Sequence, residues 1–283
     1  MRVHPALTIL GVVATVAVLG ATAASPTAAV GHGTGVWVTP PRSFPPLPAG
    51  DPAYARVVDR TLLGGRFVVQ GGTRRRDVAL TFDDGPSAFT PKIARILRSN
   101  HAAGTFFEIG EEFAHFPPHA RRLVADGFPV GDHTLTHPLL GHLAAARQRL
   151  EIATTAYELW RHGVPFPRMF RPPYGSFDAA TFEVLAPLRM LMVLWSSDSL
   201  DYATPGVGHI VHNALAGVHA GSIILMHDGG GNRWQTVHAL PLIIRRLRAG
   251  GFHLVTVPQM LSEDPPRLPQ RVRDGMGPAA TAN

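Results

Sequence analysis

The sequence predicts an α/β fold, a distorted barrel of the (β/α)7 type that forms a single domain. Of the 283 residues, 45% are hydrophobic and 16% are charged, which is enough apolar material for a large core. Between Asp77 and Leu261, short apolar runs alternate with helix-like segments. This alternation predicts parallel strands joined by crossover helices. Seven such units in so short a stretch predict a barrel that is irregular or incompletely closed.

The expected strands are short runs of β-prone apolar residues. They are Val78–Phe82, Gly104–Ile109, Phe128–Val130, Met169–Phe170, Met190–Trp195, Ser222–Met226 and His253–Val257. A further run, Phe67–Val69, is compatible with a strand, but it lies in an ambiguous segment, residues 52–76, and is left unassigned.

Three segments are expected to be helices. Pro91–Ser99 has Thr90 as a candidate N-cap and a proline at its first position, both common at helix starts. Leu143–Arg161 carries apolar residues at roughly helical spacing. Gln235–Arg248 is followed by Gly250-Gly251, which is typical of a helix end.

The N-terminal residues have the layout of an export signal. Arg2 is followed by the uncharged apolar run Ala6–Ala24 and then by small residues, as before a cleavage site of the A-x-A type. The run also approaches the roughly 20 residues that span a bilayer, so an uncleaved membrane anchor is the alternative. Both interpretations place the rest of the chain outside the cytoplasm, either secreted or attached to the membrane or cell wall.

These patterns divide the chain into four parts. Residues 1–30 are the signal peptide or anchor, and residues 31–76 are a Pro/Gly-rich linker with an N-terminal extension. Residues 77–262 form the catalytic domain. Residues 263–283 are Pro-rich and polar and are expected to be a disordered tail.

The composition excludes several classes of protein. Because there is no cysteine, a disulfide scaffold and a thiolate zinc site are impossible, and any metal must be held by histidine and carboxylate. The formal charge of +6 comes almost entirely from arginine and could attract anionic polymers. However, the basic run Arg74–Arg76 is too short to indicate nucleic-acid binding, and no nucleic-acid partner is expected.

Titratable residues follow five of the expected strands. Because active sites of parallel α/β barrels lie at the carboxyl ends of the strands, these residues should converge on one mouth. In chain order they are Asp83-Asp84; Asp132, His133 and His137; Arg171 with Tyr174; Asp198, Asp201 and Tyr202; and His227-Asp228 before Gly229–Gly231. Their convergence, more than any one residue, predicts a catalytic site.

Two of these groups indicate a metal ion. The adjacent carboxylates of Asp83 and Asp84 would repel each other, which is costly unless a cation is present. His133 and His137 are four residues apart, and on a helix this spacing puts both imidazoles on one face, as in many metal sites. Each group also has an ordinary interpretation, as a strand-to-turn signal or as a chance pair among 15 histidines.

In chain order, these residues resemble the five motifs of the polysaccharide deacetylases, the family-four carbohydrate esterases that share the NodB-homology domain. The matching stretches are Thr81–Gly85, His133–His137, Arg171–Tyr174, Trp195–Tyr202 and Leu225–His227. The resemblance spans roughly residues 77–260, and the first two motifs together are highly specific. The distorted (β/α) barrel of that family agrees with the seven apolar runs.

The resemblance implies that Asp84, His133 and His137 bind one divalent metal ion, expected to be Zn²⁺, with Co²⁺ as the alternative. It implies that Asp83 is the general base and His227 the general acid. General chemistry supports these roles. Two histidines and one carboxylate leave coordination positions open, and the cation polarises a carbonyl and lowers the pKa of bound water. A carboxylate can then take the water's proton, and a histidine can protonate the leaving amine.

The resemblance also implies roles for supporting residues. Arg171 would orient Asp83, and Asp201 would pair with His227, with Asp198 as the alternative partner.

An acetyl pocket is implied as well. Tyr174 would donate a backbone N–H to the oxyanion, and Leu225 and Tyr202 would line the pocket. Members of the family usually have tryptophan where this chain has Tyr202, so the pocket is expected to be altered on that side.

The expected activity is that of a metal-dependent hydrolase that removes N-acetyl groups from an extracellular polysaccharide. Peptidoglycan N-acetylglucosamine is the first candidate substrate, and chitooligosaccharides and acetylxylan are the alternatives. A non-catalytic glycan-binding module would be expected to lose the base, the acid or a ligand. An iron oxygenase would explain neither Asp83 nor His227, and no G-x-S-x-G serine hydrolase motif occurs. The chain is expected to act as a monomer.

Overall fold

A computed structural model describes residues 52–277, and within them the strands form one sheet. The strand order is β1-β6-β5-β4-β3-β2-β8-β7, with β9 paired to β2, and every strand pair is parallel. The strands are β1 (Phe67–Val68), β2 (Asp77–Gly85), β3 (Thr105–Glu108), β4 (Val130–Asp132), β5 (Met169–Phe170), β6 (Leu191–Val193), β7 (Ser197–Asp198), β8 (Ile223–His227) and β9 (His253–Leu254).

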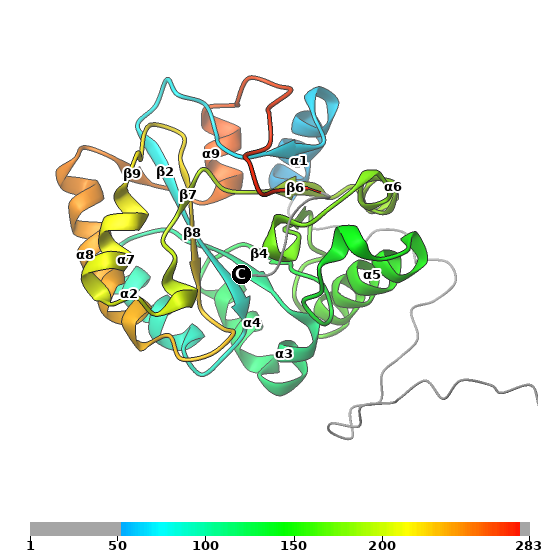
Figure 1. The fold of residues 1–283 in the computed structure, drawn as a ribbon, viewed down its shortest axis with the longest axis horizontal. Helices are drawn as coiled ribbons and strands as arrows, with labels where there is room; N and C mark the ends of the chain where they lie inside the picture. Colours follow the sequence, from blue (N-terminus) through cyan, green and yellow to red (C-terminus); the bar gives the residue numbers. More distant parts are fainter. Residues whose placement is uncertain (1–51, 278–283) are drawn as a thin grey trace, which may run out of the picture. The chain divides into compact units, whose positions relative to one another are not determined.

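Helices surround this sheet (Figure 1). They are α1 (Pro52–Gly64), α2 (Thr90–Ser99), α3 (Gly110–His115), α4 (Pro117–Ala125), α5 (Ala145–Arg161), α6 (Ala179–Leu188), α7 (Val207–Leu215), α8 (Trp234–Ala249) and α9 (Val257–Glu263). Short 3₁₀ turns, η1 (Leu140–His142), η2 (Pro173–Gly175) and η3 (Asp201–Ala203), follow β4, β5 and β7. Helices α2, α7 and α8 lie at one flank of the curled sheet, and α5 and α6 lie at the opposite flank (Figure 1).

The sheet curls back towards itself without closing through a full strand pair. An isolated antiparallel bridge joins Gln70, just after β1, to Ser222, just before β8. The β1 end of the strand order therefore meets the start of β8, next to the other end, through single residues. This arrangement confirms the prediction of a distorted barrel in one domain.

Strand β2 is the central strand of the sheet, since its nine residues are all buried and it pairs with β3, β8 and β9. Because successive side chains of a strand point to opposite faces, its two faces have different surroundings. Val78, Leu80 and Phe82 pack in the apolar layer under the helices. Thr81 and Asp83 face the barrel interior, where both accept hydrogen bonds from Arg171.

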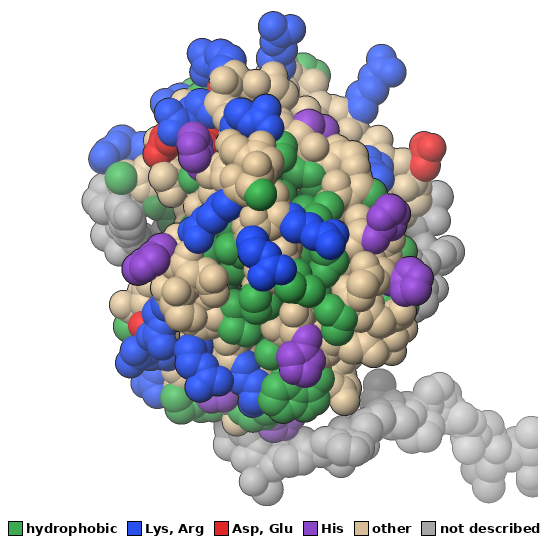
Figure 2. Space-filling view, turned by 90° about the vertical axis from the view of Figure 1, so that its left-hand side faces the viewer, with side chains coloured by type: hydrophobic (Ala, Val, Ile, Leu, Met, Phe, Trp, Pro, Cys, Tyr) green, Lys and Arg blue, Asp and Glu red, His purple; other side chains and the backbone are tan. Residues whose placement is uncertain are grey.

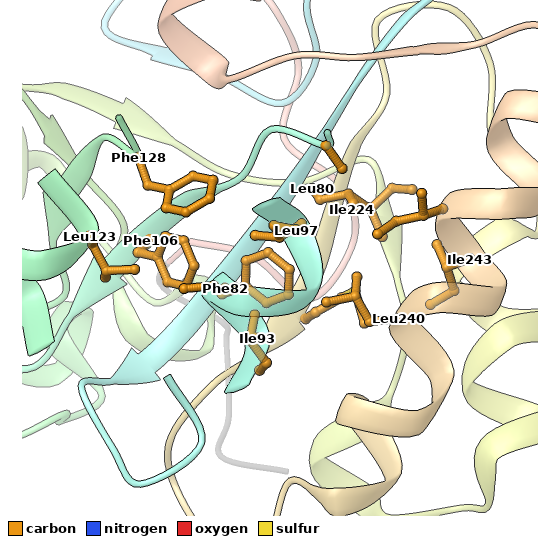
Figure 3. Packing of buried hydrophobic residues seen from close by; sticks show 14 of the residues in the cluster. Leu80, Phe82, Ile93, Leu97, Phe106, Leu123, Phe128, Ile224, Leu240 and Ile243 are labelled. Carbon is orange, nitrogen blue, oxygen red and sulfur yellow. The ribbon is translucent and has the colours of Figure 1, made fainter. Parts of the chain in front are cut away.

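The apolar layer holds the carboxyl end of β2, which carries Asp83 and Asp84, in place (Figure 3). Phe82 stacks on Phe106 of β3 with ring centroids 5.0 Å apart, and Leu97 of α2 and Leu240 of α8 belong to the same buried cluster. Truncating such a buried phenylalanine to alanine typically costs about 3–5 kcal/mol. The position of Asp83 therefore depends on the packing of its neighbour in the chain.

The expected elements agree closely with the observed ones, with a few differences. All seven apolar runs overlap a strand, although Phe128–Val130 shares only Val130 with β4, and the unassigned run after Arg66 contains β1. Strand β7 was not expected, and β9 ends at Leu254 because Thr256 caps α9 by accepting a hydrogen bond from Gln259 N–H. Thr90 is the first residue of α2 instead of its N-cap, and its hydroxyl donates to the Asp228 carboxylate.

The expected signal or anchor at residues 1–30, and the linker up to residue 51, lie outside the described residues. Among the helices that are described, none is both long and apolar enough to cross a membrane.

The segment after α9 differs from the expected disordered tail. Asp264 is buried and accepts hydrogen bonds from Arg74 and from the Arg75 backbone. Further on, Gly277 N–H donates to the Gly175 carbonyl at 2.7 Å. Buried partners such as these hold a segment in place despite its polar composition.

Candidate active site

The carboxyl ends of the strands surround a pocket of about 350 Å³. Its walls come from the loops after β2, β4, β5, β6, β7 and β8, as expected for a parallel barrel. The lining residues are Asp83, Asp84, His133, His137, Pro172, Tyr174, Trp195, Asp198, Tyr202, Leu225, His227, Gly230 and Arg233. The two remaining predicted site residues, Arg171 and Asp201, lie directly behind Asp83 and His227.

Two consecutive carboxylates reach this pocket because β2 ends irregularly. Adjacent strand residues would normally point to opposite faces. Asp84 instead has a φ of 71°, and the pairing of β2 with β3 shifts register between Asp83 and Gly85. A left-handed conformation is uncommon for a residue other than glycine, and such residues often occur at functional sites.

One group within residues 52–277 has the composition of a metal site, with ligand atoms of Asp84, His133 and His137 all within 4.8 Å of one another. The Nε2 atoms of His133 and His137 lie 3.4 Å and 3.1 Å from Asp84 Oδ1. That oxygen is buried and accepts no hydrogen bond from the described residues. Three donor atoms that face one point, with the carboxylate oxygen unsatisfied, fit a divalent cation.

The orientation of both imidazoles is fixed from behind. Nδ1 of His133 lies 2.7 Å from the Arg171 carbonyl, which can only accept, so this nitrogen carries a proton and Nε2 is left to face the same point as Asp84 Oδ1. Nδ1 of His137 lies 3.1 Å from the Tyr174 hydroxyl. Hydrogen bonds of this kind on the outer nitrogen are usual for metal-binding histidines.

The two histidines do not lie on a helix, because residues 133–139 form a loop. Thr134 and His137 both have positive φ values, 70° and 57°. The buried Glu151 of α5 accepts hydrogen bonds from the backbone of Leu135 and Thr136 and thereby supports the loop. The spacing of four residues brings the imidazoles together through these turns and not through helical periodicity.

Burial would raise the pKa of Asp84, but the neighbouring His133 and His137 outweigh it and hold this pKa well below its usual range. The carboxylate is therefore ionised at neutral pH, as a metal ligand must be.

Asp83 is held by the fully buried Arg171. The guanidinium Nη1 donates to Asp83 Oδ1 at 2.7 Å, and its other hydrogen bonds go to Thr81 and to the carbonyls of Val193 and Leu194. The guanidinium also stacks over the Phe107 ring at 4.2 Å. Removing one partner of a buried ion pair leaves an uncompensated charge, so Arg171 and Asp83 depend on each other.

On the opposite wall, His227 is paired with Asp201. Asp201 Oδ1 lies 2.7 Å from His227 Nδ1, and Oδ2 accepts from the His227 N–H and from the Thr236 hydroxyl. Burial alone would lower the pKa of His227, but the Asp201 carboxylate outweighs it and raises this pKa to about 9. Asp198 lines the pocket and accepts instead from the Leu200 N–H.

The remaining predicted residues form the walls between these groups. The Tyr202 ring meets the His227 ring edge-on at 5.4 Å, and Leu225 lies two residues before His227 on the same face of β8. Tyr174 lies in the η2 turn with a φ of 57°.

Sequence reasoning missed several buried polar groups around the site. Arg233 donates to the carbonyls of Gly229 and Gly230 and so fixes the loop after His227. Glu108, at the end of β3, is buried, and neither of its carboxylate oxygens has a hydrogen-bond partner among the described residues. Neither Arg233 nor Glu108 belongs to a sequence motif with a recognisable spacing, and only the fold brings them close to the site.

A larger hollow of about 840 Å³ lies beside α1, where Arg56, Arg60 and Arg189 contribute to its lining. It contains none of the predicted site residues, so its size does not make it the reaction centre.

Comparison with known proteins agrees with this geometry. The model of the polysaccharide deacetylase family matches residues 70–193. A chitooligosaccharide deacetylase from Bradyrhizobium sp. (strain ANU 289) is 38% identical over 199 residues, covering 65% of this chain and 90% of that protein. A peptidoglycan-N-acetylglucosamine deacetylase from Bacillus cereus is 35% identical over 189 residues, covering 65% of this chain and 87% of that protein.

The solved structures agree as well. The crystal structure of the Bc1960 peptidoglycan N-acetylglucosamine deacetylase superimposes with a TM-score of 0.67 at 34% identity, and the match covers 71% of this chain and 95% of that one. Fold, site and sequence similarity thus agree, and the chain belongs to the polysaccharide deacetylase family.

Proposed function

We propose that this protein is a metal-dependent deacetylase that hydrolyses the N-acetyl groups of peptidoglycan N-acetylglucosamine outside the cytoplasm. The observation that carries the proposal is the arrangement of three groups around one pocket. These are the ligand trio around Asp84, the Asp83–Arg171 pair and the His227–Asp201 pair. A glycan-binding module would need none of this chemistry.

Asp84, His133 and His137 are proposed to hold the metal, with Zn²⁺ the first candidate and Co²⁺ the alternative. Two imidazoles and a carboxylate suit zinc and leave coordination positions open. When bound, such a cation supplies Lewis acidity, which polarises the acetyl carbonyl and acidifies a neighbouring water.

Asp83 is proposed to be the general base. Arg171 occupies its Oδ1, and Oδ2 lies 3.7 Å from His133 Nε2, on the side of the ligand trio. Oδ2 takes the proton of the attacking water as the new C–O bond forms. The oxyanion that develops on the carbonyl oxygen can be stabilised by the Tyr174 backbone N–H, since η2 places this residue in the pocket wall.

His227 is proposed to be the general acid. Its Nδ1 is bonded to Asp201, so the Nε2–H is left to donate to the amide nitrogen as the C–N bond breaks. The products are acetate and the free amine of the sugar. Tyr202 and Leu225 are proposed to enclose the acetyl methyl group, since both line the pocket next to His227.

The choice of peptidoglycan as the first candidate substrate is supported by similar proteins and by the expected export signal. The Bacillus cereus relative is a peptidoglycan-N-acetylglucosamine deacetylase, and such a protein acts on the cell wall. We propose that the protein is an exported monomer. Whether it is secreted or stays attached to the wall or membrane, it would come into contact with peptidoglycan. A chitooligosaccharide substrate is the second candidate, because the Bradyrhizobium relative is a chitooligosaccharide deacetylase.

Acetate release from a panel of glycans tests the proposal. The metal-loaded protein is incubated with peptidoglycan, with chitin oligomers and with acetylxylan, and Asp83→Asn is the matched inactive control. Release from peptidoglycan at the highest kcat/KM is the expected result. A preference for chitin oligomers would move the assignment to the second candidate. No release from any N-acetylated glycan would overturn the function.

A further inference from the structure

An exposed tryptophan stands at the carboxyl end of the sheet, the end that also carries the active-site pocket. Trp234 is the first residue of α8 and directly follows Arg233, which lines the pocket. Its side chain is 47% exposed, unusual for so large an apolar group, whereas the neighbouring Arg233 is buried. A large apolar surface left open beside a binding site is frequently part of that site.

The Trp234 ring is held in position by its neighbours. Phe89 meets it edge-on at 5.6 Å, and His238, one turn along α8, stacks against it at 5.9 Å. The Lys92 ammonium lies 5.4 Å from its centroid. A ring fixed in advance loses little conformational freedom when a ligand covers it, so the full contact contributes to affinity.

The Trp234 ring and its neighbour Phe89 follow the two strands that carry the proposed catalytic groups. Phe89 follows β2, which carries Asp83 and Asp84, and Trp234 follows β8, which carries His227. The Ser87 hydroxyl donates to the Asp228 carbonyl and ties the two loops together. The pocket and the exposed ring therefore lie at the same, carboxyl end of the sheet. Hydrophobic side chains also gather among Lys, Arg and His on the side of the molecule that carries α8 (Figure 2).

We propose that Trp234 is a sugar-binding platform for the glycan chain, at least one residue away from the sugar that loses its acetyl group. A β-linked pyranose presents an apolar face of C–H groups, which can lie flat on an aromatic ring while its hydroxyls stay in water. The inference rests on the proposed function and adds a substrate class to it. The preferred substrate is a β-1,4-linked glycan chain of several sugars that contains N-acetylglucosamine, not a single sugar or a dimer.

The test compares a short oligomer with a long one. Acetate release from the N-acetylglucosamine dimer and pentamer is measured for the wild type, Trp234→Ala, Trp234→Phe and Trp160→Ala, a control on the distant helix α5. Aromatic contacts contribute about 0.5–1.5 kcal/mol beyond area burial, so the ratio of pentamer to dimer kcat/KM should fall roughly 3–10-fold in Trp234→Ala. The loss should lie mainly in KM, Trp234→Phe should recover part of it, and Trp160→Ala should keep the wild-type ratio.

Binding measured by calorimetry separates this inference from the proposed function. A wild type that binds the pentamer more tightly than the dimer, with the difference lost in Trp234→Ala, supports the platform even if no acetate is released. An unchanged ratio and an unchanged pentamer affinity in Trp234→Ala would overturn it. So would equal losses on both oligomers with a lowered melting temperature, since that pattern indicates a purely structural ring.

Discussion

Replacing Asp201 with asparagine should move the alkaline limit of activity to lower pH. The Asp201 carboxylate accepts three hydrogen bonds, two of them from His227, and it is the main reason that the pKa of His227 rises from 6.5 to about 9 against the effect of burial. At about 1.4 kcal/mol per pKa unit, this rise corresponds to roughly 3 kcal/mol in favour of the protonated imidazole. An asparagine keeps the size of the side chain but removes the charge.

The size of the effect depends on pH. The proposed acid must be protonated, so the rate falls as pH rises through the pKa of His227. At pH 8, a group with a pKa of 9 is about 90% protonated, and one with a pKa of 6.5 is about 3% protonated, a difference of about 30-fold. Near pH 6 the two proteins should differ much less. The Asp201→Asn profile should therefore fall at a pH lower by about two units.

The assay is the pH dependence of kcat/KM for acetate release between about pH 5 and 10. Asp198→Asn is the control, since this neighbouring carboxylate lines the pocket but is not bonded to His227. Its alkaline limit should stay within a few tenths of a unit of the wild type. A profile of Asp201→Asn that falls at the wild-type pH, with only its height reduced, would refute the role of Asp201 in charging His227.

Four further outcomes are expected. Asp83→Asn should keep its metal yet lose roughly 10²–10⁴-fold in kcat, the usual size of a general-base contribution, and full activity would remove it as the base. His133→Ala should lose most of its metal by elemental analysis, and a wild type that keeps full activity in chelator would contradict a metal mechanism. Tyr202→Trp should stay active while Tyr202→Ala loses much of its rate; normal turnover by the alanine variant would remove this residue from the acetyl pocket. N-terminal sequencing of the exported protein should find cleavage near Ala24 or Ala29, or an intact anchor, whereas a full-length soluble cytoplasmic protein would exclude both.

Much of the fold was predictable because the barrel repeats one unit. Each apolar run overlaps a strand, and the rule that sites lie at strand ends was enough to gather the residues that line one pocket. The distortion of the barrel could also be anticipated, since its units are short.

The local geometry could not be predicted because it depends on contacts distant in sequence. The conformation of the loop that carries His133 and His137 depends on backbone hydrogen bonds to the carboxylate of Glu151, which lies on the separate helix α5. The choice between Asp198 and Asp201 as partner of His227 is made by tertiary contacts, including the Thr236 hydroxyl on α8. Asp198 and Asp201 are only three residues apart, and nothing in the sequence shows which of them will contact His227 on strand β8.

The ordered C-terminal segment changes where the functional unit ends. Gly277 donates to the carbonyl of Gly175, and Met276 packs so closely on Gly175 that an added Cβ would lie 2.9 Å from its Cγ. Gly175 follows Tyr174, so the last described residues brace the turn that forms one wall of the pocket. A shortened version of the protein that stopped with the last motif would keep every proposed catalytic side chain and still lose this brace. The five motifs mark where the proposed chemistry is, but the contacts that support the pocket wall extend to residue 277.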